Sequence, residues 1–145
     1  MTSSSLARGF TLLELLVAML IAGILLALGL PRFNAARDSR SVRGALDVLS
    51  SGFSLARETA LSRRAPVAVV FDTAGGGVMR IRSAGGPIRR SDLFASFGVT
   101  VTANRDSAVY DPRGVGYGLS NLSVIVRRGN FVDTLTVSRL GRVRW

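Results

Sequence analysis

The stretch of residues 10–30, FTLLELLVAMLIAGILLALGL, decides the fold of this chain. As an α-helix it spans about 30 Å, which is the thickness of the hydrocarbon core of a bilayer. Each leucine, isoleucine, valine or phenylalanine contributes about −0.3 to −0.6 kcal/mol to membrane insertion, and a centrally placed acid costs about 3 kcal/mol. Insertion is therefore favourable despite the one charged residue, Glu14. The sequence predicts a transmembrane helix over residues 10–30.

The residues before this stretch, 1–9 (MTSSSLARG), are short, polar and carry one positive charge, Arg8. A secretory signal peptide is cut after its apolar segment, at a site of small residues. Here the sharp change in composition lies before the apolar segment, at Gly9–Phe10. Gly9 has no side chain, so an extended backbone can enter a protease site closely. Arg8 favours a cytoplasmic position for the leader.

Residues 8–15, RGFTLLEL, resemble the cleavage and methylation motif of type IV prepilins and type II secretion pseudopilins. The match consists of glycine at the cut, phenylalanine next, and glutamate as the fifth residue of the mature chain. The resemblance implies that a prepilin peptidase cuts after Gly9 and that the new amine of Phe10 is N-methylated. It also implies a single-pass protein of the bacterial inner membrane, with its C-terminal domain on the periplasmic side.

An acid inside a membrane requires a partner or must become protonated. In the prepilin family that partner is taken to be the terminal amine of a neighbouring subunit, so the resemblance assigns Glu14 to filament assembly. The alternative from the residues alone is an ordinary membrane anchor whose glutamate reaches back to the interface.

Composition limits the size and chemistry of the chain beyond the anchor. The chain has 145 residues and a net charge of +10, and all 19 of its basic residues are arginine. After one anchor helix there is room for a single domain of roughly 80 to 110 residues. The complete use of arginine in place of lysine suggests a GC-rich codon supply, so it is weak evidence for phosphate recognition. Cysteine is absent, so a disulfide framework is excluded.

The helical pattern continues beyond the apolar stretch. Pro31 removes a backbone donor and is predicted to kink the helix without ending it, at a place where type IV pilins commonly carry a helix-bending proline. Apolar residues then continue at helical spacing to Ala60, namely Val42, Leu46, Leu49, Phe53 and Ala56. We expect one helix over residues 11–63, with Gly44 and Gly52 each weakening it by about 1 kcal/mol relative to alanine.

From Pro66 onward the pattern is that of short strands. Residues 66–72 and 77–83 flank a predicted hairpin turn, and an irregular passage rich in arginine is expected from residue 85 to 97. Further strands are expected at 98–102, 108–110 and 141–145. Another hairpin is expected to join 122–128 to 131–138 through Gly129 and Asn130. The spacing favours one antiparallel sheet, or two small ones, packed on the helix.

This tail narrows the resemblance to the GspH/FimT family of pseudopilins and minor pilins. The residues that carry it are the ARETA stretch at 56–60, RRAPV at 63–67, YDPRG at 110–114 and GRVR at 141–144. The implied fold is α+β and type IV pilin-like, with a long N-terminal helix packed on a small antiparallel β domain. The predicted parts are a leader (1–9), a transmembrane helix (10–30), its amphipathic continuation (31–64) and a β-rich globular domain (65–145).

Catalysis is not expected. Histidine and cysteine are absent, so serine–histidine and cysteine–histidine catalysis and the usual zinc sites are excluded. The acids are dispersed, with no calcium-loop pattern. The glycines at 75–77 lack the lysine of a phosphate loop, and those at 114–118 do not open a helix, so both clusters are predicted to be turns. We expect no metal, no cofactor and no enzymatic activity.

Two functions fit this sequence. The first is a minor pseudopilin that assembles with other pilin or pseudopilin subunits and supports the secretion of protein cargo. The second is a minor pilin that captures DNA during natural transformation. Arg142 and Arg144 match the DNA-contacting tail of FimT-type pilins, and alternation along a strand places them on one face. Arg127, Arg128 and Arg139 are candidates to extend that patch, and Trp145 is a candidate to stack on a base. The alternative is an edge strand kept soluble and unpaired by its charge.

Overall fold

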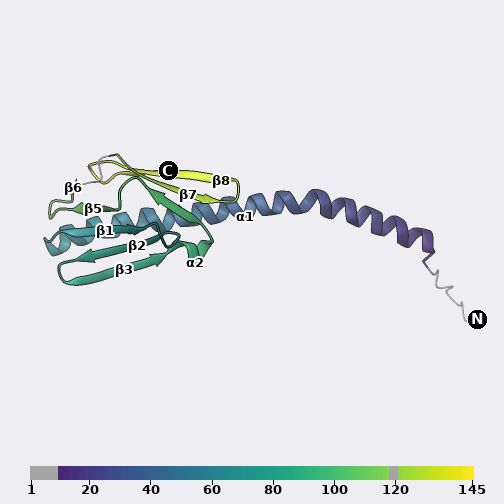
Figure 1. The fold of residues 1–145 in the computed structure, drawn as a ribbon, viewed down its shortest axis with the longest axis horizontal. Coiled ribbons are helices and arrows are strands. Elements are labelled where there is room, and N and C mark those ends of the chain that lie inside the picture. The colour runs from purple at the N-terminus through teal and green to yellow at the C-terminus, as the bar shows by residue number, and fades with distance from the viewer. Residues whose placement is uncertain (1–9, 118–120) are drawn as a thin grey trace, which may run out of the picture. The chain divides into compact units, whose positions relative to one another are not determined.

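The computed structural model describes residues 10–117 and 121–145. The chain forms two compact units, Met1–Asn34 and Ala35–Trp145. One long helix, α1 (Leu12–Arg63), begins in the first unit and ends in the second (Figure 1). The predicted helix, 11–63, agrees with α1 to within one residue. The leader lies outside the described residues, and the four-part division of the chain stays a prediction.

The part of α1 in the second unit is amphipathic, as predicted. The apolar residues from Val42 to Ala60 that obey helical spacing are all fully buried: Val42, Leu46, Leu49, Phe53, Ala56 and Ala60. Between them, charged residues such as Arg43, Asp47 and Glu58 are exposed. α1 ends at Arg63, three residues before Pro66, because the residue before a proline disfavours the helical conformation. This face of α1 is where the domain packs.

The first sheet contains five antiparallel strands in the order β3-β2-β1-β5-β6. Its centre is the hairpin of β1 (Val67–Asp72) and β2 (Val78–Ser83), in which Asp72 lies opposite Val78 across the predicted turn. β5 (Ser107–Tyr110) pairs with the other edge of β1, and β6 (Gly116–Tyr117) pairs with β5. The alternating burial of β1 turns Val67, Val69 and Phe71 towards the helix.

The passage expected to be irregular is instead regular structure. β3 (Gly86–Asp92) extends the sheet beyond β2, and a short helix, α2 (Leu93–Phe97), comes directly after it. Asp92 caps α2 by accepting a hydrogen bond from the Ala95 amide at 2.9 Å, and Gly98 ends it in the left-handed region at φ 63°. β3 is an edge strand with Arg89 and Arg90 exposed, so its sequence lacks the alternation that identifies a half-buried strand.

The second sheet contains four antiparallel strands in the order β4-β7-β8-β9. The predicted hairpin is present as β7 (Leu122–Arg128) and β8 (Phe131–Val137), with Arg128 opposite Phe131 across the two-residue turn. β4 (Thr100–Ala103) pairs with β7, and β9 (Val143–Arg144) pairs with β8 at the edge. Both sheets therefore build on the same half of α1, as Figure 1 shows.

The core is one cluster formed by the buried face of α1 and the inner faces of both sheets. Gly44 and Gly52 lie on α1 where the domain approaches most closely. A Cβ added at Gly44 would lie 2.8 Å from Cε1 of Phe97, and one added at Gly52 would lie 2.9 Å from Sδ of Met79. From the sequence, these glycines are expected only to weaken the helix. In the folded domain they make room for side chains from α2 and β2.

The fold class predicted from the sequence, a long helix packed on a small antiparallel β domain, is confirmed. The choice between one sheet and two is decided in favour of two.

Candidate functional site

The beginning of α1 carries a capping box around the membrane acid. The Glu14 carboxylate accepts hydrogen bonds from the Thr11 amide at 3.0 Å and from the Thr11 hydroxyl at 3.1 Å. The Thr11 hydroxyl in turn accepts from the Glu14 amide at 3.2 Å. Two orphan amides at the helix start are thus satisfied reciprocally. In the single chain, Glu14 has polar partners from its own first turn.

The apolar residues around Glu14 have no cover within their own unit. Phe10 is 81% exposed and Leu13 is 71% exposed, and an 18-residue apolar window of α1 contains no buried residue. By length and composition this helix can cross a membrane. Such a surface in water would be an aggregation hazard, so it requires lipid or other apolar helices.

The other predicted residues of this region are Phe10, Gly9 and Pro31. Phe10 immediately precedes the capping box, and Gly9 lies outside the described residues. α1 continues through Pro31, so the proline does not end the helix. The kink expected there stays a prediction.

At the other end of the chain, the tail lines a groove. Arg142 and Arg144 flank Val143, and Arg144 lies opposite Thr136 in the pairing of β9 with β8. Both arginines line one groove of about 870 Å³ on the second sheet. The same groove is lined by Arg57 of α1 and by the hydroxyl side chains of Ser123, Thr136 and Ser138. Cationic and hydroxyl donors in one concave site are suited to an anionic ligand.

The backbone of the tail is held by two hydrogen bonds that close one tight turn. The Gly141 amide donates to the Ser138 carbonyl at 2.8 Å, and the Ser138 amide donates to the Arg142 carbonyl at 2.9 Å. Gly141 has a φ of 75°, and a Cβ there would lie 2.9 Å from Cε1 of Tyr110. Tyr110 is fully buried, and this burial raises the pKa of its hydroxyl to about 12. The nearby Arg57 guanidinium opposes that rise in pKa only in part.

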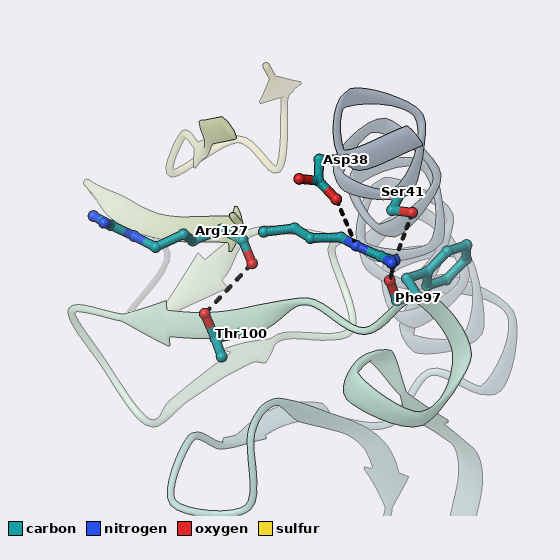
Figure 2. A network of polar contacts seen from close by, with 6 residues as sticks. Asp38, Ser41, Phe97, Thr100 and Arg127 are labelled. Carbon is teal, nitrogen blue, oxygen red and sulfur yellow. Dashed lines mark hydrogen bonds and ion pairs between the residues drawn. The ribbon is translucent and has the colours of Figure 1, made fainter. Parts of the chain in front are cut away.

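The remaining candidate arginines do not join this groove. Arg128 lies at the far end of the β7–β8 hairpin, where its Nε is 2.9 Å from the Asp38 carboxylate. It also donates to the Ser41 hydroxyl at 2.8 Å and to the Phe97 carbonyl. Figure 2 shows this network between α1 and the end of α2, with the Arg127 side chain extending away from it. Arg128 thus holds the hairpin to the helix through its Nε and Nη1 donors.

Arg127 and Arg139 are both exposed. The backbone of Arg127 accepts a bond from the Thr100 hydroxyl at 3.4 Å, and the carbonyl of Arg139 accepts from the Gly116 amide at 3.1 Å. Neither side chain lines the groove. Of the five arginines predicted from the sequence, the structure brings Arg142 and Arg144 together.

Two features of these sites are not among the predictions from the sequence: the place of Arg57 in the groove and the capping box at the start of α1. Arg57 lies in the ARETA stretch and off the apolar face of the helix, and nothing in its spacing indicates that it meets the tail. The capping box was visible, since threonine with glutamate three residues later, before an apolar run, is its signature.

In residues 10–117 and 121–145, no group of three acidic, histidine or cysteine side chains is placed to hold a metal ion. The carboxylate of Asp111 accepts the amides of Arg113 and Val115, at 2.9 and 2.8 Å, and so shapes its own loop.

Two protein-family models match this chain, one at its N-terminus and one over the β domain. The family model for the prokaryotic N-terminal methylation motif matches residues 4–30, and that for the Type II transport protein GspH matches residues 45–141. The chain is 28% identical to the pilin-like protein PilA1 of Thermus thermophilus, over 94% of this chain and 97% of that protein.

Solved structures show the same fold. A crystal structure of the type IV minor pilin FimU from Pseudomonas aeruginosa is similar with a TM-score of 0.61, covering 73% of this chain and 88% of FimU at 17% identity. A second crystal form of FimU is similar with a TM-score of 0.57 and 18% identity, covering 70% of this chain and 90% of FimU. These families are structural pilin and pseudopilin subunits. The chain carries a prokaryotic N-terminal methylation motif and belongs to the Type II transport protein GspH family.

Proposed function

We propose that this protein is a minor subunit of an inner-membrane filament, a type II secretion pseudopilus or a type IV pilus, and that it supports protein secretion. The observation that carries the proposal is the apolar part of α1, which begins around Glu14 and is exposed over residues 12–27. Such a helix is satisfied first by lipid and then by the helices of neighbouring subunits. The β domain, on the periplasmic side, contacts other minor subunits or secreted cargo.

Processing precedes assembly in this proposal. A prepilin peptidase cuts after Gly9, and the amine of Phe10 is methylated. The new terminus then lies next to the Thr11–Glu14 capping box. In the membrane, Thr11 keeps the Glu14 carboxylate solvated by hydrogen bonds until the subunit joins a filament. There the terminal amine of a neighbouring subunit pairs with the same carboxylate and sets the register between the two helices.

Two variants separate the capping role of Glu14 from its charge. Glu14→Gln keeps a side-chain oxygen that can accept the Thr11 amide but removes the negative charge. Thr11→Val keeps the charge but removes the hydroxyl. We expect both variants to be inserted and cut after Gly9, and only Glu14→Gln to lose more than about tenfold in filament incorporation, since an unpaired terminal amine in the membrane costs several kcal/mol.

The measurement is N-terminal mass analysis of the membrane-extracted protein, together with quantification of the subunit in sheared filaments. A chain that still begins at Met1, or Glu14→Gln incorporation equal to that of the parent chain, would contradict the mechanism.

A second candidate function is favoured by the placement of Arg142 and Arg144 in one groove. We propose that this groove binds the phosphates of DNA during uptake. Binding should weaken as salt rises, because each phosphate contact releases counterions. Arg142→Ala combined with Arg144→Ala should flatten the salt dependence by about two phosphate contacts. Binding that ignores salt and these substitutions would contradict DNA capture by this tail.

The two functions are separated in cells. In a strain that lacks the gene, loss of protein export with normal transformation supports the secretion subunit, and the reverse supports the DNA-uptake pilin. The tail variant with both arginines replaced should reduce transformation only in the second case.

A further inference from the structure

The third arginine of the groove comes from a different part of the chain. Arg57 lies on α1, and its Nε donates to the Gly114 carbonyl at 3.2 Å. Among the residues that the structure describes, this is the only hydrogen bond that the guanidinium of Arg57 makes. One edge of the planar group is thereby fixed to the loop after β5, while its terminal nitrogens remain available to the groove that the side chain lines.

Contact between the tail and Arg57 is direct. A Cβ at Gly141 would lie 3.3 Å from Cδ of Arg57 and 2.9 Å from Cε1 of Tyr110. Gly141 therefore passes over the arginine stem and the edge of a buried ring, in a φ region that favours glycine. The next residue, Arg142, enters the same groove. Folding thus brings a helix arginine and the tail arginines to one place.

The charge of this groove is unbalanced. Among the residues that the structure describes, its lining includes Arg57, Arg142 and Arg144 and no aspartate or glutamate. Three like charges in one concavity repel one another, and a bound anion removes that cost. The hydroxyls of Ser123, Thr136 and Ser138 add donors at the same site. Arg128, by comparison, has its carboxylate partner in Asp38.

We propose that Arg57 is a third phosphate ligand, and that Arg57, Arg142 and Arg144 form one clamp for the backbone of a nucleic-acid strand. This inference rests on the second proposed function and names the site that performs it. Arg57 supplies a guanidinium already oriented by Gly114, so less freedom is lost when the phosphate binds. Gly141 is the positioning residue that holds the tail arginines against Arg57.

The test is binding of a radiolabelled single-stranded oligonucleotide to the full chain in neutral detergent micelles, measured over a series of salt concentrations. Arg57→Gln should lower affinity about 5- to 10-fold at low salt and reduce the salt dependence by about one phosphate contact. Arg43→Gln is the matched control, because it removes the same charge from an exposed position of the same helix. It should change affinity by less than about twofold.

A double variant tests whether the arginines act together. Because Arg57 and Arg142 line one groove and act on one strand, the effects of Arg57→Gln and Arg142→Gln should be non-additive by more than the error of the single changes. Additive effects, or equal losses in Arg57→Gln and Arg43→Gln, would overturn the clamp while leaving DNA binding by the tail intact.

Two further outcomes are distinguishable. A parent chain that shows no salt-dependent binding contradicts the second function itself, and the clamp with it. If Arg57→Gln fails to fold by circular dichroism, Arg57→Lys decides, because lysine keeps the charge and the stem but loses the oriented fork. It should bind about two- to fivefold more weakly than the parent chain, and unchanged affinity would overturn the proposal.

Discussion

The buried residue Tyr110 makes the stability of the domain depend on pH above about pH 10. Its hydroxyl is buried, and among the described residues it has no hydrogen-bond partner. Burial raises its pKa from 10.0 to about 12. Since the folded-state pKa lies above the unfolded value, the neutral ring contributes fully to stability below about pH 10. That contribution is lost as the pH rises from 10 towards 12.

We therefore expect Tyr110→Phe to flatten the loss of stability between pH 10 and 12. At neutral pH the same change should be neutral or stabilising by about 1 kcal/mol, because it removes an unsatisfied buried hydroxyl and keeps the ring. Thermal melts monitored by near-ultraviolet circular dichroism across this pH range measure both effects. A Tyr110→Phe chain that melts earlier at neutral pH would show that the hydroxyl has a favourable partner.

The importance of Glu14, unlike that of Tyr110, can be recognised from the sequence. Its place in an apolar stretch and its place in the methylation motif are both evident from the residues, and the motif match is confirmed. The hydrogen bonds to Thr11 add a local role to the one expected in filament assembly. The capping bonds are made within one chain, so they are compatible with the proposal that a neighbouring subunit neutralises the same carboxylate.

At the level of elements, α1 depends on glycine for close packing. On an isolated helix, glycine to alanine stabilises by about 1 kcal/mol. At Gly44 and Gly52 we expect the opposite sign, because the added methyl group meets the Phe97 ring or the Met79 side chain. The expected cost is about 1 to 3 kcal/mol for each substitution, as is usual for overpacking.

Gly23→Ala provides the matched control, since a Cβ at Gly23 has no heavy atom within 4 Å in the described structure. It should leave the melting temperature of the β domain unchanged. Thermal melts of the three variants in the same detergent measure the difference. If Gly44→Ala and Gly52→Ala raised the melting temperature, the contacts of Phe97 and Met79 with α1 would not be tight enough to matter.

The elements that were predicted well are those with strong internal periodicity. The hairpin of β7 and β8 has alternating apolar residues and a glycine–asparagine turn, and its bounds agree with the structure to within one residue. The strands β3 and β6 and the helix α2 were not predicted, and β6 lies in the glycine cluster that was expected to be a turn. β3 lacks a buried face of its own, and α2 has five residues, with Asp92 and Gly98 as its only local signals.

For the molecule as a whole, the sequence was sufficient to predict the fold class and the family. The groove was beyond it, because the groove depends on long-range packing. The meeting of Arg57 with Arg142 is determined by Gly114, Gly141 and the buried Tyr110 ring, none of which is near both arginines in sequence. Likewise, nothing in the sequence distinguishes Arg128 from the other arginines of the tail, but in the fold it forms an ion pair with Asp38.

The orientation of the chain in the membrane also cannot be predicted by counting charges alone. Arg8 is the single arginine before the apolar stretch, whereas Arg32, Arg37, Arg40 and Arg43 lie closely behind it. The positive-inside bias alone would place this second group in the cytoplasm, but long domains translocate largely regardless of charge. The periplasmic position that we propose for the β domain thus relies on the family motif and on the fact that long domains are translocated largely regardless of their charge.

The end of β9 has a practical consequence. Trp145 is the one tryptophan of the chain, comes directly after Arg144 and is 52% exposed. Its indole emission therefore reports on the tail alone, without background from the membrane helix or the core. Quenching of this emission by a nucleobase would place a ligand at the tail without any attached dye, and a spectrum that stays constant as filaments form would place the tail away from subunit contacts.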